Sequence, residues 1–129
     1  MKKKILIVLA DYYKEISDGL LKSALRSIPR SSRVKIIRVP GVFEIPVTIS
    51  KNLKKFDAFV ALGCVIKGQT PHFDFISQAS TNAIMDISVS QKKPVGNGII
   101  TCLNMKQAKA RKSKGAEAAN AVVSILSQK

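Results

Sequence analysis

The chain has 129 residues, of which 46% are hydrophobic and 23% are charged, as is typical of one globular domain. This composition excludes an intrinsically disordered chain, and the length suffices to bury a substantial core. The 22 Lys and Arg residues against 8 Asp and Glu give a formal net charge of +14. That charge favours an anionic partner or substrate without deciding between RNA, a membrane and a phosphorylated metabolite. We expect a single domain over residues 1–129.

The sequence indicates a cytoplasmic protein. Its basic N-terminus resembles a signal peptide, but the apolar run over residues 5–10 is too short, Asp11 interrupts it, and a cleavage-site pattern is missing. No apolar run approaches the ~20 residues that a membrane-spanning helix needs. Cys64 and Cys102 lie in apolar stretches without CxxC spacing, which predicts buried, reduced thiols. Because the chain has one histidine and these two distant cysteines, we expect no metal site.

Along the chain, apolar runs typical of buried strands alternate with apolar spacings typical of helices. Residues 4–10 predict a first strand, and residues 16–28 predict a helix that Pro29 ends. The later predictions, in order, are a strand over 34–39, a helix over 45–53, a strand over 57–66, a helix over 73–87, a strand over 95–102, and helices over 105–109 and 116–126.

Strands that alternate with helices favour a parallel sheet with helices on both faces. Because parallel neighbours need right-handed crossovers, we predict an α/β fold, a three-layer flavodoxin-like sandwich around a four-stranded parallel sheet. A sheet this small also favours an oligomer that covers its remaining apolar edge. Ligands of such sheets bind beyond the carboxyl ends of the strands, so the segments after the predicted strands are candidate site segments.

The segment after the third predicted strand carries two such candidates. Gly68-Gln69-Thr70 opens a helix, where free backbone N–H groups and the helix dipole favour a phosphate. Alternatively, Thr70 is only the N-cap before Pro71 at the first helical position. His72, the only histidine, is either a general acid or base near neutral pH or a solvent-exposed residue at a helix start.

Three other segments leave similar alternatives open. Glu44 stands at a helix start, where a carboxylate either complements the helix dipole or binds a ligand. Tyr12 is either a ring that stacks on a planar ligand or a half-buried residue at a helix entry. The basic run over residues 106–114 is mostly typical of a solvated helix face, from which one charge is able to reach an anion.

Two long motifs occur in order along the chain. Residues 39–46 read VPGVFEIP and residues 61–73 read ALGCVIKGQTPHF. They resemble the VPGxxEIP and ALGxVIRGxTxHF signatures of the lumazine synthase family, and residues 98–101 with 107–108 and residues 114–119 resemble its C-terminal pattern.

The resemblance implies a known reaction. The family condenses 5-amino-6-(D-ribitylamino)uracil with 3,4-dihydroxy-2-butanone 4-phosphate to 6,7-dimethyl-8-ribityllumazine, the penultimate step of riboflavin biosynthesis. Its path runs through a Schiff base, loss of phosphate and ring closure, and it uses no metal or organic cofactor. Because every step moves protons, one well-placed imidazole suffices chemically, and much of the remaining catalysis is positioning.

The resemblance also assigns roles to individual residues. His72 matches the family's proton-transfer histidine, and Tyr12 matches the aromatic residue that stacks on the pyrimidine. The rest of the pyrimidine and ribityl pocket is expected from the side chains of Val42, Phe43 and Glu44 and from backbone groups of Cys64, Val65 and Ile66.

For the phosphate, the resemblance implies Gln69, Thr70 and Arg111, with Lys114 as the following family lysine. In this family the site lies between neighbouring subunits of a pentamer, so Asn97, Arg111 and Lys114 are expected from the neighbour and activity requires the oligomer. Whether pentamers stay single, pair or close into a shell is left open.

Three departures from the family pattern bear on these roles. Asn97 stands where most members have an aromatic residue, so stacking from the neighbour is lost, although an amide is able to hydrogen-bond the uracil. The chain is shortened between Arg111 and Lys114, which makes the match of Arg111 depend on where the gap lies. Lys67 replaces an arginine, which keeps the charge but not the bidentate fork.

Two hypotheses compete with the enzyme. The first is a basic nucleic-acid-binding α/β module, which only the net charge of +14 favours, because the lysines are scattered and no RNA-binding signature with paired aromatics occurs. The second is a paralogue of the same fold that binds a flavin or pteridine-like ligand without turnover. The enzyme predicts small-molecule substrates, one of them phosphorylated, and no membrane partner.

Overall fold

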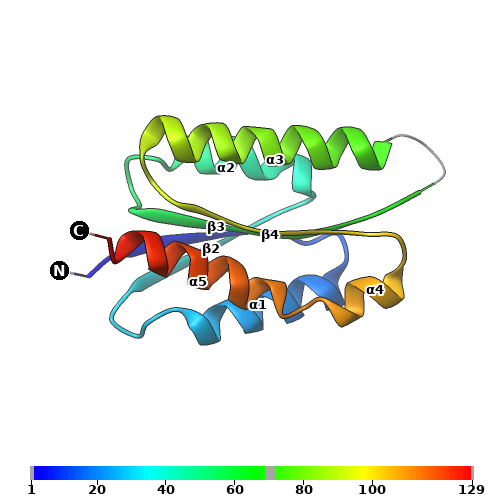
Figure 1. The fold of residues 1–129 in the computed structure, drawn as a ribbon, viewed down its shortest axis with the longest axis horizontal. Coiled ribbons are helices and arrows are strands. Elements are labelled where there is room, and N and C mark those ends of the chain that lie inside the picture. The colour runs from blue at the N-terminus through cyan, green and yellow to red at the C-terminus, as the bar shows by residue number, and fades with distance from the viewer. Residues whose placement is uncertain (1, 69–71, 129) are drawn as a thin grey trace.

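The computed structural model describes residues 2–68 and 72–128 and consists of a sheet between two layers of helices (Figure 1). Helices α2 and α3 cover one face of the sheet, and α1, α4 and α5 lie on the other (Figure 1). The elements in chain order are β1 (Lys4–Ala10), α1 (Lys14–Ser27), β2 (Arg33–Val39), the 3-10 helix η1 (Val42–Glu44), α2 (Ile45–Lys51), β3 (Ala58–Ile66), α3 (His72–Gln91), β4 (Val95–Cys102), α4 (Met105–Ala110) and α5 (Lys114–Leu126).

The four strands are all parallel and lie in the order β2-β1-β3-β4. This confirms the predicted α/β class and the flavodoxin-like sandwich around a four-stranded parallel sheet. The predicted strand over 95–102 has the bounds observed for β4, and the other strands agree to within one residue. Helix α3, predicted over residues 73–87, extends to Gln91 in the structure. Helix α2 ends at Lys51, two residues before its predicted end.

Pro29 ends α1 as predicted, and the backbone shows why. Ile28, the C-cap, has an extended conformation with ψ of 130°. The ring of a proline disfavours the helical conformation of the residue before it, so the helix stops there. This places the turn between α1 and β2 at the end of the sheet opposite the carboxyl ends of the strands (Figure 1).

The core has two halves, one on each face of the sheet. Along β1, Ile5 and Ile7 pack toward α1 and α5, whereas Leu6 and Val8 pack toward α2 and α3. All four side chains are fully buried, as expected for a central strand of a parallel sheet covered on both faces. The edge strand β2 differs, since Ile36 remains 38% exposed.

Helices α1 and α5 approach each other closely at Gly115. A Cβ atom at this position would lie 2.1 Å from the carbonyl oxygen of Leu20 on α1, which no side chain tolerates. The glycine therefore sets the distance between the two helices on this face. Among the described helices, none combines the length and apolar character needed to span a membrane.

Candidate functional site

The carboxyl ends of β1 and β3 form a crevice where the chain changes its crossing direction. After β1 the chain enters α1 on one face, and after β3 it reaches α3 on the other (Figure 1). Strand β3 pairs with β1 only as far as Leu62, whereas it pairs with β4 as far as Ile66. Beyond Leu62, one side of the β3 backbone therefore faces the crevice. Open α/β sheets bind ligands at such a switch point.

A cavity of about 740 Å³, here called the main cavity, lies at this crevice. Its volume is in the range of small-molecule sites. It is lined by Tyr12, Tyr13, Gly41, Val42, Phe43, Glu44, Cys64, Val65, Ile66, His72, Phe75, Ile76 and Ala79. The structure thus brings together eight predicted site residues: Tyr12, Val42, Phe43, Glu44, Cys64, Val65, Ile66 and His72.

One wall of the main cavity was not predicted from the sequence. Phe75, Ile76 and Ala79 follow His72 at intervals of three, four and seven residues, so they share one face of α3 with it. The apolar spacing over residues 73–87 already indicated this helix. Extending the site from His72 along the same helical face would have found the wall.

The segment after β1 presents two aromatic rings to the main cavity. The rings of Tyr12 and Tyr13 meet edge to face, with centroids 4.9 Å apart. Tyr12 is 75% exposed, whereas Tyr13 is half-buried. Burial above all, and then the nearby Tyr12 and Cys64, raise the pKa of the Tyr13 hydroxyl. Tyr13 is therefore a neutral hydrogen-bonding group at physiological pH, and Tyr12 offers a free ring face for stacking.

The η1 segment forms another wall, and Gly63 allows it to pack against β3. A Cβ atom at Gly63 would lie 2.8 Å from Val42 Cγ2 and 3.0 Å from Ala10 Cβ. Glu44 follows at the start of α2, where its carbonyl oxygen accepts a 2.8 Å hydrogen bond from Thr48 Oγ1. The half-buried Glu44 side chain therefore lines the main cavity at the start of α2.

The predicted buried thiols are confirmed, and they lie on neighbouring strands. Cys64 pairs in register with Ile100, and Ile66 pairs with Cys102. Both cysteines are free and buried. Burial, followed by the nearby Cys102 and a side-chain hydrogen bond with it, raises the pKa of Cys64 to about 12. Cys64 therefore lines the cavity as a neutral thiol and is unsuited to act as a nucleophile.

Three predicted residues lie elsewhere, in a second hollow of about 500 Å³ beside β4, here called the β4 groove. It contains Asn97, Arg111 and Lys114 and shares no lining residue with the main cavity. The β4 groove is lined by Asn97, Ile99, Ile100, Thr101, Ala110, Arg111, Ser113, Lys114 and Glu117. Within one chain, the predicted site residues are therefore divided between two hollows.

Short-range contacts hold the residues of the β4 groove. Arg111 caps the end of α4, and its Nη1 donates a 3.3 Å hydrogen bond to the carbonyl oxygen of Thr101. Lys114 Nζ lies 3.7 Å from Glu117 Oε1. Asn97 Oδ1 accepts a 3.0 Å hydrogen bond from the backbone N–H of Ile99. Arg111 is exposed, so its guanidinium is accessible to an anion.

Comparison with known proteins identifies the family. A family model described as 6,7-dimethyl-8-ribityllumazine synthase matches residues 2–129. A curated relative of that name from Cutibacterium acnes is 42% identical and aligns over 95% of this chain and 80% of its own. A relative of the same name from Bartonella tribocorum is 41% identical over 100% of this chain and 93% of its own length. Another from Agrobacterium fabrum is 40% identical over 99% of this chain and 95% of its own length.

The chain belongs to the 6,7-dimethyl-8-ribityllumazine synthase family. Membership confirms the resemblance drawn from the motifs over residues 39–46 and 61–73. In this lumazine synthase family member, both motifs contribute walls to one cavity. Gln69 and Thr70, predicted for the phosphate, lie outside the described residues.

One further predicted site residue of this lumazine synthase family member lies at the edge of the sheet. Asn97 is exposed on the edge strand β4 and lines the β4 groove. Within residues 2–68 and 72–128, no three His, Cys, Asp or Glu side chains lie close enough to hold a metal ion.

Proposed function

We propose that this protein condenses 5-amino-6-(D-ribitylamino)uracil with 3,4-dihydroxy-2-butanone 4-phosphate to form 6,7-dimethyl-8-ribityllumazine. The observation that carries the proposal is the main cavity, which gathers Tyr12, Glu44 and His72 at the switch point of the sheet in a member of this family. The family model spans nearly the whole chain, which supports one catalytic domain over residues 1–129. The two free thiols support a reducing compartment, the cytoplasm.

The main cavity offers the chemistry that a pyrimidine carrying a sugar alcohol requires. The exposed ring of Tyr12 stacks on the flat heterocycle. The backbone of β3 beyond Leu62 presents hydrogen-bonding groups to the edge of the uracil, on the side where β1 has ended. Glu44 accepts hydrogen bonds from hydroxyl groups of the ribityl chain. Val42 and Phe43 close the pocket around it.

His72 moves the protons of the reaction. The amine of the pyrimidine attacks the ketone to give a Schiff base with loss of water. The phosphate then leaves by elimination, the enol that results tautomerises to a new ketone, and the second amine closes the ring onto this carbonyl with loss of a second water. Each of these steps transfers a proton, and an imidazole is able both to accept a proton and to donate one. His72 lies at the first position of α3 on the helical face that lines the cavity, so it reaches the bound pyrimidine.

The β4 groove completes the site of a neighbouring subunit. Its Arg111, Lys114 and Asn97 share no hollow with His72 in the same chain, and β4 is an edge strand whose outer side is available to a partner. Head-to-tail contacts of this kind close into rings, and we propose the pentamer that the family resemblance implies. In the ring, Arg111 of one subunit binds the phosphate held by Gln69 and Thr70 of the next.

A complementation experiment tests both parts of this proposal. Product formation is measured, with the phosphorylated substrate well below its wild-type KM, for the wild type, His72→Ala, Arg111→Ala, and an equal mixture of the two variants assembled from unfolded chains. Random assembly pairs an intact His72 with an intact Arg111 at about one quarter of the interfaces, so we expect about one quarter of the wild-type activity. Recovery no greater than the average of the two single variants would contradict a shared site.

The wild-type assay separates this function from its alternatives. Lumazine formation at substrate saturation, with a light-scattering mass of a ring, is the expected result. Inactivity of the wild type under these conditions would refute the enzyme. Release of product after a single turnover excludes a paralogue that only binds its ligand. The nucleic-acid module rests only on the net charge of +14, whereas membership in the family favours the enzyme.

A further inference from the structure

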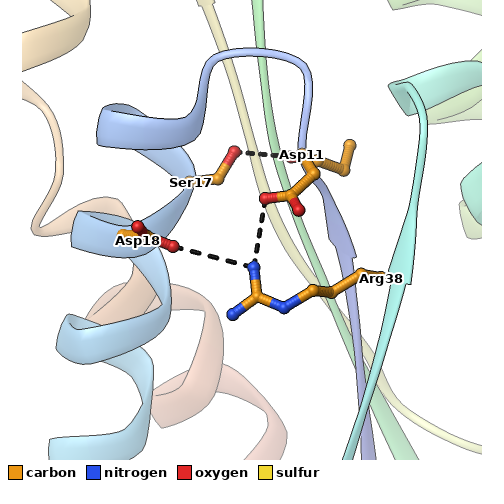
Figure 2. Close-up of polar contacts among 5 residues, drawn as sticks. Asp11, Ser17, Asp18 and Arg38 are labelled. Atoms are coloured by element: carbon orange, nitrogen blue, oxygen red, sulfur yellow. Dashed lines mark hydrogen bonds and ion pairs between the residues drawn. The ribbon is translucent and has the colours of Figure 1, made fainter.

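An arginine outside the main cavity connects the two segments that supply its walls. Arg38, near the end of β2, points toward α1 and the end of β1 (Figure 2). Its Nη1 atom lies 3.1 Å from Asp11 Oδ1 and 3.7 Å from Asp18 Oδ1. The first contact is a hydrogen bond between residues 27 positions apart in the sequence. We call this group of three side chains the Arg38 clasp.

The Arg38 clasp is placed where it controls the aromatic segment. Asp11 directly precedes Tyr12 and Tyr13, and Arg38 lies four positions before Val42, the first residue of η1. The backbone N–H of Asp11 also donates a 2.9 Å hydrogen bond to the carbonyl oxygen of Val39. The ends of β1 and β2 are therefore joined by one backbone hydrogen bond and one side-chain ion pair. The segments that follow these two strands line the main cavity.

A second anchor fixes the same segment from the side of α1. The hydroxyl of Ser17, which is fully buried, donates a 2.5 Å hydrogen bond to the carbonyl oxygen of Ala10 (Figure 2). Asp18 follows on the same helix and contacts Arg38. The start of α1 is thus attached to the end of β1 and, through Arg38, to the end of β2.

The clasp contributes to geometry more than to stability. Its side chains are 45%, 29% and 49% exposed for Arg38, Asp11 and Asp18, and exposed ion pairs contribute little to the free energy of folding. The ring of Tyr12 is 75% exposed, so its position follows that of its backbone. Removing the guanidinium would also leave two carboxylates on adjoining segments, where like charges repel.

We propose that Arg38 is a positioning residue, which holds the segment of Tyr12 and Tyr13 in place for the pyrimidine substrate by neutralising Asp11 and Asp18. None of the three clasp residues lines the main cavity, so the effect passes through the position of the aromatic segment. The proposal rests on the proposed function, because the stacked substrate is the one assigned there to Tyr12.

The test compares Arg38→Gln with Lys109→Gln in steady-state kinetics. The control removes an ion pair of similar exposure, Lys109 Nζ to Glu15 Oε2 at 3.7 Å, which also attaches to the start of α1. Since stacking on an aromatic side chain contributes substantially to binding a base, we expect Arg38→Gln to raise KM for the pyrimidine about threefold to tenfold. In Arg38→Gln, the KM for the phosphorylated substrate, kcat and Tm stay close to the wild-type values. In Lys109→Gln, both KM values, kcat and Tm stay close to wild type.

A double variant and a binding measurement make the test decisive. Asp11→Asn with Arg38→Gln is expected to raise KM for the pyrimidine no further than Arg38→Gln alone, because the second change removes no additional contact with Arg38 and relieves the repulsion between Asp11 and Asp18. An unchanged KM for the pyrimidine in Arg38→Gln, or an equal rise for both substrates, would overturn the proposal. So would a loss explained by a large fall in Tm.

A binding measurement tests the Arg38 clasp even if the proposed enzymatic function fails. If the wild type makes no lumazine, the Kd for 6,7-dimethyl-8-ribityllumazine, read from the fluorescence of that compound, still compares the wild type with Arg38→Gln. Weaker binding by Arg38→Gln alone would support the clasp while the enzymatic function fails. Equal Kd values, or no binding by the wild type, would refute the clasp as a positioning device.

Discussion

The main cavity and the β4 groove differ in how the fold builds them. The main cavity stands at the ends of β1 and β3, the central strands, whose side chains are buried on both faces. The β4 groove lies on an edge strand and on the connection between α4 and α5, and most of its side chains are polar or charged. The apolar hollow suits a heterocycle, and the basic one suits a phosphate. One chain therefore carries two unlike halves of the proposed site.

The contacts within each half predict that the two halves differ in rigidity. The walls of the main cavity are attached to the core by tight packing, as at Gly63, and by buried hydrogen bonds, as at Ser17. Arg111 of the β4 groove has one 3.3 Å hydrogen bond to a carbonyl oxygen and is exposed. An arginine held this loosely is able to turn toward an anion on a neighbouring subunit. The comparison suggests a preformed half that a more adaptable half completes.

The largest expected effect is on proton transfer in the main cavity. Replacing His72 with Ala should lower kcat about 100-fold, since general acid–base catalysis typically contributes 10²- to 10⁴-fold and the positioning groups remain. Both KM values should stay near wild type. Asp74→Asn, on the exposed side of the same helix, serves as the control and should be silent. A changed KM with unchanged kcat would show that His72 binds substrate instead.

The next effect tests whether the β4 groove serves the same substrates. Arg111→Ala should raise KM for the phosphorylated substrate about 10-fold to 100-fold, as expected for losing a hydrogen bond between charged groups. The KM for the pyrimidine should change by less than about twofold. Lys106→Ala, which removes an exposed charge from α4, is the matched control. If Lys106→Ala has the same effect, general charge and not the groove attracts the phosphate.

A smaller effect concerns the wall that η1 forms. Gly63→Ala introduces a methyl group where Val42 Cγ2 would be 2.8 Å away, so the free energy of unfolding should fall by about 1–3 kcal/mol. Urea denaturation measures this change. Gly68→Ala is the control, because a Cβ there meets nothing within 4 Å and should alter stability by less than about 0.5 kcal/mol. Equal stability of the two variants would show that the wall yields without strain.

The last effect is absent at neutral pH and appears only at alkaline pH. Because the pKa of Cys64 is raised from 9.0 to about 12 in the folded chain, the unfolded chain loses this proton at a lower pH. The unfolded state then binds fewer protons, so the free energy of unfolding should fall as pH rises from 9.0 toward 12. Urea denaturation across this range should show a shallower fall for Cys64→Ala. Parallel pH profiles for the two proteins would contradict the perturbed thiol.

Much of the fold and the main cavity could be predicted from local patterns. The apolar period distinguishes strands from helices, and Pro29 places a helix end to within one residue. The carboxyl ends of parallel strands meet at one edge of the sheet, which predicts that the segments after the strands hold the site. The roles of Val42, Cys64 and other single residues follow instead from the resemblance to the family. The wall of α3 beyond His72 was missed, although the same helical period contains Phe75 and Ile76.

The sequence by itself determined the elements, their alternation and the chemistry available at the strand ends, because these depend on residues a few positions apart. Only the tertiary structure decided that Arg38 meets Asp11 and that Cys64 lies beside Cys102. It also places Arg111 and His72 in separate hollows, a division that the family resemblance implies. Such pairings depend on strand order and on which face each helix covers, and dozens of residues can separate the partners. Packing and burial over the whole chain set these distances, and no local pattern records them.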